Sequence, residues 1–128
     1  MKIEGFTTIQ INKIHYPIIT QIKLSLAEKI KLNRLDKRLK HLPSFPTIRA
    51  IMIIDFTKPT AAGRELLGQQ AADARSNQPD FKFDHNDAMG ITEYAGQTIL
   101  YIGLGALRMQ NFQEYFDRIF QRFSAHLN

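Results

Sequence analysis

Three polar side chains follow directly after the most hydrophobic stretch of the sequence. Residues 48–60 read IRAIMIIDFTKPT, and the apolar run ends at Asp55, with Thr57 and Thr60 close behind it. In open α/β sheets, ligand sites lie beyond the carboxyl ends of the strands, where loop amides and helix N-termini converge. A carboxylate and two hydroxyl groups at that position would suit a small ligand, a metal ion or a phosphate. Asp55, Thr57 and Thr60 are therefore a candidate ligand-binding site.

A structural role for Asp55 is the competing interpretation. Short acidic side chains commonly accept hydrogen bonds from backbone amides of the turn that follows them. A binding site needs several cooperating groups, and no second site residue is evident beside this acid. We therefore expect Asp55 to end the strand and to stabilise the next turn.

Other residues with chemical potential are scattered. Asp84, His85 and Asp87 lie close together and could hold a divalent cation, but the segment lacks the length and the closing glutamate of a calcium loop, so a solvated turn is the simpler interpretation. The remaining histidines lie in separate segments without a serine or acid at a telling spacing. Cysteine is absent, which excludes disulfides and thiolate sites. We predict no catalytic residue, no metal site and no cofactor.

Positive charge is concentrated in the first part of the chain. Residues 1–50 hold ten Lys and Arg against three acids, although the whole chain has a net charge of only +5. Most of this excess falls on one predicted helix, whose cations are Lys29, Lys31, Arg34, Lys37, Arg38 and Lys40. Such a helix could bind an acidic protein, an anionic lipid surface or nucleic-acid phosphates, or could be a solvated face. No aromatic or amide side chains accompany the cations to read bases.

The first half of the sequence predicts two strands and this helix. Residues 6–12 and 16–26 have strand-like composition, and Pro17 indicates an edge strand or a bulge in the second. The helix could start at a capping box of Ser25 and Glu28, or about two turns later at Asn33 and Asp36. Its apolar stripe is Leu32, Leu35, Leu39 and Leu42, and Pro43 and Pro46 end it.

The second half predicts a central strand and an amphipathic last helix. Residues 48–56 are apolar on both faces, as in a strand covered by helices on each side. A helix is expected over 58–77, starting near Pro59 and Thr60. Residues 81–110 fit either a hairpin or a buried helix, because periodicity does not separate the two. The phenylalanine-rich segment 111–128 predicts a helix capped by Asn111, which could pack wholly on the sheet or leave one edge for a homodimer contact.

Several degenerate motifs follow one another along most of the chain. An N-terminal hairpin leads to a helix ending in LP, the strand AIMIIDFT, a helix with TAAGRELL, a short strand DAMGIT and an amphipathic last helix. This order resembles the STAS-like fold of anti-sigma factor antagonists and sulfate-transporter tails. Phosphorylated members of that family carry Asp-Ser-Ser-Gly at the start of the second helix, where this sequence has TAAG at 60–63. Only Thr57 or Thr60 could stand in for the phosphoacceptor serine.

These patterns bound the class of protein. A chain of 128 residues has room for one domain, and 44% apolar and 23% charged residues are typical of a globular protein. We expect a single α/β domain, STAS-like, with a mixed sheet of about four to five strands and three to four helices. No apolar run is long enough to cross a membrane and no signal sequence is evident, so we expect a cytoplasmic protein. The predicted function is a non-catalytic protein-interaction or regulatory module.

Overall fold

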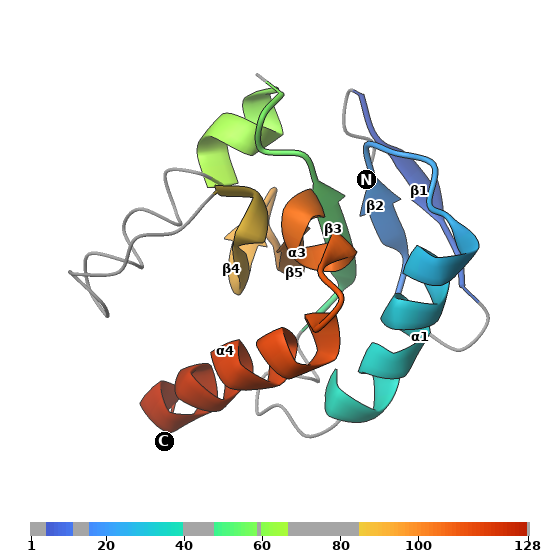
Figure 1. The fold of residues 1–128 in the computed structure, drawn as a ribbon. Helices are drawn as coiled ribbons and strands as arrows, with labels where there is room; N and C mark the ends of the chain where they lie inside the picture. The colour runs from blue at the N-terminus through green and yellow to red at the C-terminus, as the bar shows by residue number, and fades with distance from the viewer. Residues whose placement is uncertain (1–4, 12–15, 40–47, 59, 67–84, 128) are drawn as a thin grey trace.

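The chain folds into one mixed five-stranded sheet with helices against it (Figure 1). The computed structural model describes residues 5–11, 16–39, 48–58, 60–66 and 85–127, without the side chains of 36, 37, 85 and 121–127. The sheet contains β1 (Thr7–Ile9), β2 (Ile18–Thr20), β3 (Ala50–Ile54), β4 (Met89–Tyr94) and β5 (Gln97–Gly103), in the spatial order β1-β2-β3-β5-β4. The three inner strands run parallel, whereas β1 and β4 pair antiparallel with their neighbours. The predicted α/β fold with a mixed sheet is confirmed.

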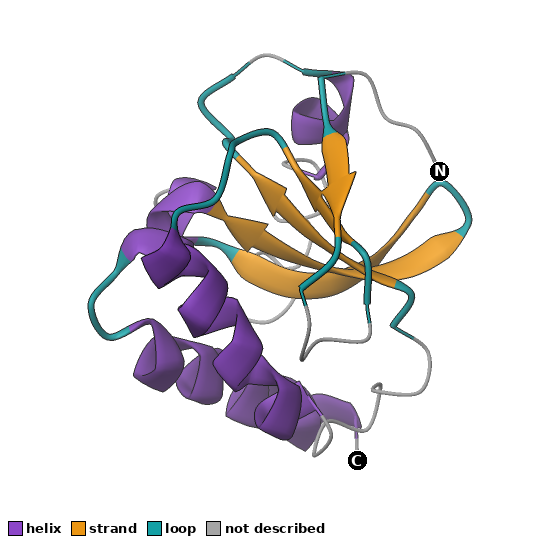
Figure 2. Cartoon of the chain, turned by 90° about the vertical axis from the view of Figure 1, so that its right-hand side faces the viewer, coloured by secondary structure: helices purple, strands orange, loops and turns teal. Residues whose placement is uncertain are grey.

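Helices cover both faces of the sheet. They are α1 (Leu26–Leu39), a helical segment at 61–66, the 3-10 turn η2 (His85–Asp87), α3 (Leu104–Arg108) and α4 (Phe112–Leu127). Figures 1 and 2 show α1, α3 and α4 gathered on one side of the sheet, with the segment 61–66 on the other side.

The central strand β3 supplies both halves of the core. Ile51 and Ile53 belong to the cluster that includes the α1 leucines and the α4 phenylalanines, whereas Ala50, Met52 and Ile54 belong to the cluster under the segment 61–66. All five residues of β3 are buried. This two-sided burial explains why the sequence of β3 is apolar without alternation, as predicted.

The start of α1 corrects the predicted boundary of the second strand. β2 is only three residues long, and the chain enters α1 at Leu26 instead of continuing as a strand. The capping box explains this early start: the amide of Ser25 donates to Glu28 Oε1 over 2.8 Å, and the amide of Glu28 donates to Ser25 Oγ over 3.2 Å. The alternative start at Asn33 and Asp36 is therefore wrong.

The edge position suggested by Pro17 is also wrong. β2 lies inside the sheet between β1 and β3, and Pro17 precedes its first residue. Its carbonyl accepts the amide of Ile51 over 3.1 Å, so the residue takes part in pairing through the group that proline retains. The missing N–H of a proline is harmless here because the strand begins after it.

The undecided region is a hairpin and not one buried helix. β4 and β5 pair antiparallel from Met89 with Ile102 to Tyr94 with Gln97. Ala95 and Gly96 form the two-residue connection, with φ angles of 52° and 78°. Positive φ at both central residues is the geometry that matches the twist of paired strands. Helix α3 begins only after β5 ends.

The remaining predicted helices are confirmed where the structure describes them. The Thr60 hydroxyl accepts the amide of Gly63 over 3.0 Å, as expected of the residue that starts the helical segment 61–66. The rest of the predicted helix 58–77 lies outside the described residues, as do Leu42, Pro43 and Pro46. In α4, the carbonyl of Asn111 accepts the amide of Tyr115, which places Asn111 at the predicted N-terminal boundary. Phe112, Phe116 and Phe120 are buried in the core.

Candidate functional site

The carboxyl ends of the three parallel strands meet at one edge of the sheet. Gln21 follows β2, Asp55 follows β3, and Gly103 ends β5. The turn η2 reaches this edge as well, because its Asn86 contacts both Asp55 and the backbone at Gly103. We call the group of Gln21, Asp55, Thr57 and Asn86 the Asp55 edge.

Asp55 accepts three hydrogen bonds through a single carboxylate oxygen. The donors to Oδ1 are the Thr57 amide at 3.0 Å, the Thr57 hydroxyl at 2.6 Å and the Asn86 side-chain amide at 3.2 Å. Burial raises the pKa of Asp55, but the hydrogen bonds from Thr57 and Asn86, with the nearby charge of Lys58, outweigh it and keep this pKa below its ordinary value. Asp55 is therefore ionised in its structural role at neutral pH.

The two predicted hydroxyl partners are used within the chain. Thr57 donates both its amide and its hydroxyl to Asp55, closing the turn directly after β3. Thr60 instead caps the helical segment 61–66. The three residues thus stabilise the strand-to-helix connection, which is the role that the sequence favoured for Asp55.

Gln21 and Asn86 are members of the Asp55 edge that sequence reasoning missed. Gln21 Oε1 accepts the Asp55 amide over 2.7 Å, and Asn86 Oδ1 accepts the Phe56 amide over 2.8 Å. The first contact joins residues 34 positions apart and the second joins residues 30 positions apart, so no local sequence pattern predicts them. Gly103, the last residue of β5, was the available signal. A Cβ atom at Gly103 would lie 2.4 Å from the Asn86 carbonyl oxygen, so the close approach of η2 requires a glycine there.

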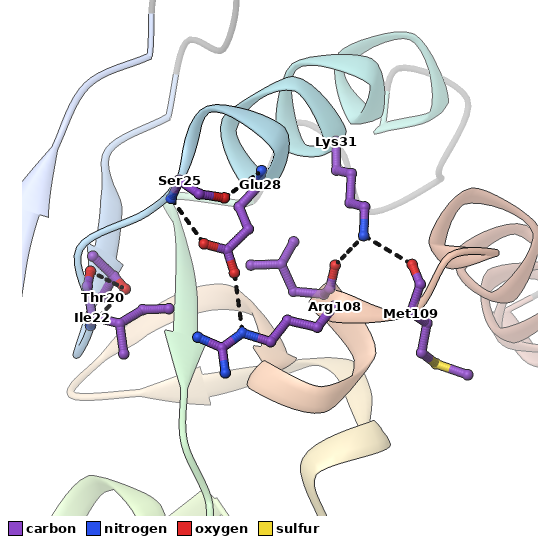
Figure 3. A network of polar contacts seen from close by, with 8 residues as sticks. Thr20, Ile22, Ser25, Glu28, Lys31, Arg108 and Met109 are labelled. Atoms are coloured by element: carbon purple, nitrogen blue, oxygen red, sulfur yellow. Dashed lines mark hydrogen bonds and ion pairs between the residues drawn. The ribbon is translucent and has the colours of Figure 1, made fainter.

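In the second candidate site, the basic helix α1, some of the cations form contacts with other parts of the fold (Figure 3). The ammonium group of Lys31 donates to the carbonyls of Leu107 and Met109, at 3.0 and 2.9 Å, and so caps the C-terminal end of α3. Arg38 forms an exposed ion pair with Asp117 of α4, with Nε 2.6 Å from Oδ1. Two of the six predicted partner-binding cations therefore attach α1 to the neighbouring helices.

Glu28 completes the attachment of α1 to α3 (Figure 3). Besides closing the capping box, its carboxylate accepts the Arg108 guanidinium, with Nε 3.2 Å from Oε2. Burial raises the pKa of Glu28, but the hydrogen bonds from Ser25 and Arg108 and the positive charge of Arg108 hold this pKa below its ordinary value. The one acid in the first turn of α1 is thus turned inward and neutralised within the chain.

The side of α1 that faces away from the core has a different character. Leu26 and Ile30 are 74% and 41% exposed, and they are the exposed large hydrophobic residues of the described chain. Lys29 and Arg34 are exposed beside them and form no ion pair with any described residue. We call Leu26, Lys29, Ile30 and Arg34 the outer face of α1. Of the other predicted cations, Lys40 and the side chain of Lys37 lie outside the described residues.

The weaker candidates do not assemble into a site in the described part of the chain. Asp84, His15 and His41 lie outside it, and the side chains of His85 and His126 are not described. The carbonyl of Asp87 accepts the Tyr115 hydroxyl over 2.6 Å, which ties η2 to α4. Among the described residues, His, Asp and Glu side chains nowhere gather in a group of three or more that could hold a metal ion.

The hydropathy of the helices and the comparisons with known proteins bear on the class of protein. Within the described residues, none of the helices combines the length and the apolar composition needed to span a bilayer. The likeness to STAS domains rests on the sequence motifs given above and stays a hypothesis. No family model, no curated protein and no solved structure matches this chain.

Proposed function

We propose that this chain is a non-catalytic, cytoplasmic protein-interaction module that binds its partner through the outer face of α1. The observation that carries the proposal is the exposure of Leu26 and Ile30 on a helix whose opposite side is fully buried. Exposed aliphatic side chains with charged groups beside them are typical of a surface that another protein covers. A regulatory role would agree with the STAS-like order of motifs in the sequence.

A ligand-binding or enzymatic role at the Asp55 edge has less support. Its donors and acceptors are directed at one another: Thr57 and Asn86 donate to Asp55, and Gln21 accepts its amide. A ligand would meet one remaining carboxylate oxygen, and among the described residues no group of three or more His, Asp and Glu side chains gathers there. Cooperating groups of that kind are what a catalytic or metal site requires.

A nucleic-acid role for α1 also has less support. Phosphate binding depends on the number of cations that are available to the nucleic-acid backbone, and Lys31 and Arg38 are engaged in contacts with other groups of the chain. The exposed aliphatic pair at positions 26 and 30 offers nothing to a phosphate chain. A protein surface is the partner that uses both kinds of side chain.

Site-specific photo-crosslinking in living cells tests the proposal. A benzophenone amino acid would replace Ile30 on the outer face of α1 and, as a control, exposed Arg118 on α4. We expect discrete protein adducts from position 30 that survive nuclease treatment and are absent from position 118. Adducts that disappear with nuclease, or equal adducts from both positions, would overturn the proposal.

A further inference from the structure

Charged groups around the exposed aliphatic pair indicate what kind of protein would cover it. From residue 21 to residue 35 the sequence contains one acid, Glu28, which is only 7% exposed and is paired with Arg108. The exposed charged residues in this stretch are Lys23, Lys29 and Arg34, all of them cations. The exposed charge that the described residues of this stretch carry is therefore positive, and Glu28 is turned inward.

Helical spacing aligns the apolar and cationic members of this surface. Leu26, Ile30 and Arg34 follow one another at intervals of four residues, which places them along one side of α1. The buried leucines at 32, 35 and 39 occupy the opposite side. An apolar stripe continued by a cation matches a partner segment that carries aliphatic side chains followed by acids.

We propose that the outer face of α1 docks an acidic, amphipathic helical segment of another protein, an inference that rests on the proposed function. Complementary charge would orient the partner and speed its association, while Leu26 and Ile30 would supply the apolar contact. A 14-residue helix offers only a small contact area, so the complex belongs to the transient class with micromolar affinity.

Two other occupants fit this surface less well. A second copy of the chain meeting the same face across a two-fold axis would set Lys29 and Arg34 against their own counterparts, and like charges oppose such contact. An anionic membrane would accept the cations, but surface-bound helices bury a broad apolar face rich in bulky side chains. The outer face of α1 has two aliphatic residues and no aromatic one.

Fluorescence anisotropy with designed peptides provides the test. The probe is a labelled peptide of about 15 residues, long enough to form a helix when bound, with leucines four apart flanked by glutamates. Its controls are a scrambled peptide of equal composition and a version with lysines in place of the glutamates. We expect the probe, but neither control peptide, to bind with micromolar affinity. This affinity should weaken as the salt concentration rises.

Matched variants separate the two components of binding. The double change Lys29→Gln with Arg34→Gln should weaken the affinity for the probe about fivefold, corresponding to roughly 1 kcal/mol for two exposed charge pairs. The double change Leu26→Gln with Ile30→Gln should weaken this affinity more than tenfold. The control pair Arg64→Gln with Arg118→Gln removes two exposed cations elsewhere and should leave the affinity unchanged.

The outcomes distinguish the inference from the proposed function. Crosslinked protein adducts at position 30 that persist unchanged when Lys29 and Arg34 are replaced would overturn the acidic partner while leaving the interaction module intact. Failure of the probe to bind, or equal binding of the lysine version, would overturn the inference as well. Recruitment to phosphatidylserine vesicles without peptide binding, or a dimer abolished by the Leu26 and Ile30 changes, would replace the partner with lipid or a second copy. Absence of any adduct would overturn the proposed function itself.

Discussion

The Asp55 edge and the outer face of α1 contrast in how their side chains are used. At the Asp55 edge, residues that look like a site hold the backbone together: Asp55, Thr57 and Asn86 form hydrogen bonds of 2.6 to 3.2 Å with one another. On the outer face of α1, Leu26 and Ile30 are exposed beside Lys29 and Arg34, which form no ion pair with a described residue. The side chains with the greatest chemical potential thus stabilise the fold, whereas two aliphatic side chains on α1 are exposed.

The contrast shows how residues of one type acquire different roles. Lys31 and Lys29 are two positions apart on the same helix, yet Lys31 caps the end of α3 and Lys29 faces solvent. Removing a group that satisfies a buried partner costs stability, whereas removing an exposed group does not. Stability measurements can therefore assign each residue to the fold or to a surface open for binding.

The largest effect is expected where η2 sits against the end of β5. Gly103 has an ordinary extended backbone, with φ −67° and ψ 144°, so alanine at this position is opposed by steric contact with the backbone of Asn86 and, less closely, of Ala88. Gly103→Ala should lower the free energy of unfolding by about 3 kcal/mol, because the η2 backbone must move. Urea denaturation measures this change in the free energy of unfolding.

Gly105→Ala is the control for this steric effect. Its new Cβ would lie 3.0 Å from the same carbonyl oxygen, and alanine gains helix propensity within α3. We expect a change below about 1 kcal/mol. Equal stability of Gly103→Ala and wild type would mean that η2 is not seated on β5.

The side chain of Asn86 should have the next largest effect. Asn86→Ala removes the donor to Asp55 and leaves the amide of the buried Phe56 without its acceptor, so we expect a loss of about 2 kcal/mol. Asn86→Asp keeps an acceptor but places a second carboxylate beside Asp55. Thermal unfolding at two pH values should therefore show the Asp variant recovering part of its deficit on acidification, unlike the Ala variant. Identical pH responses would argue against direct contact with Asp55.

Glu28 should stabilise the chain by a smaller, pH-dependent amount. Its pKa is lowered in the folded state, so its charge favours folding above the ordinary value of about 4.3, and this contribution is lost as pH falls through the lower folded-state pKa. Glu28→Gln keeps the reach to the Ser25 amide but removes the charge that pairs with Arg108. We expect a loss of about 1 kcal/mol at pH 7 that shrinks as the pH falls below the ordinary carboxyl pKa. A difference independent of pH would exclude this electrostatic contribution.

The smallest effect is expected on the outer face of α1. Leu26→Gln with Ile30→Gln should change the free energy of unfolding by less than about 0.5 kcal/mol, since both side chains are exposed. Leu32→Ala, on the buried side of the same helix, should cost about 3 kcal/mol and serves as the control. A large loss in the double variant would show that the outer face supports the fold, and the contrast with the Asp55 edge would fail.

Local patterns were sufficient for much of the architecture. The uninterrupted apolar run at 50–54, the leucine spacing of α1, the phenylalanine face of α4 and the Ser25–Glu28 capping box each describe residues within a few turns of one another. Their physical signals are periodicity and hydrogen bonds between near neighbours. These elements could therefore be predicted before any packing was known.

Long-range contacts were needed for the rest. Residues 97–103 are apolar enough for a helix, and they become a strand because β3 pairs with them from Ala50 and Ile99 to Ile54 and Gly103. Asn86 reaches Asp55 across 31 positions, and Lys31 reaches α3 across 76 and 78. Which cations attach α1 to the fold, and which stay exposed, depends on where α3 and α4 pack, and such contacts between distant segments leave no local pattern in the chain.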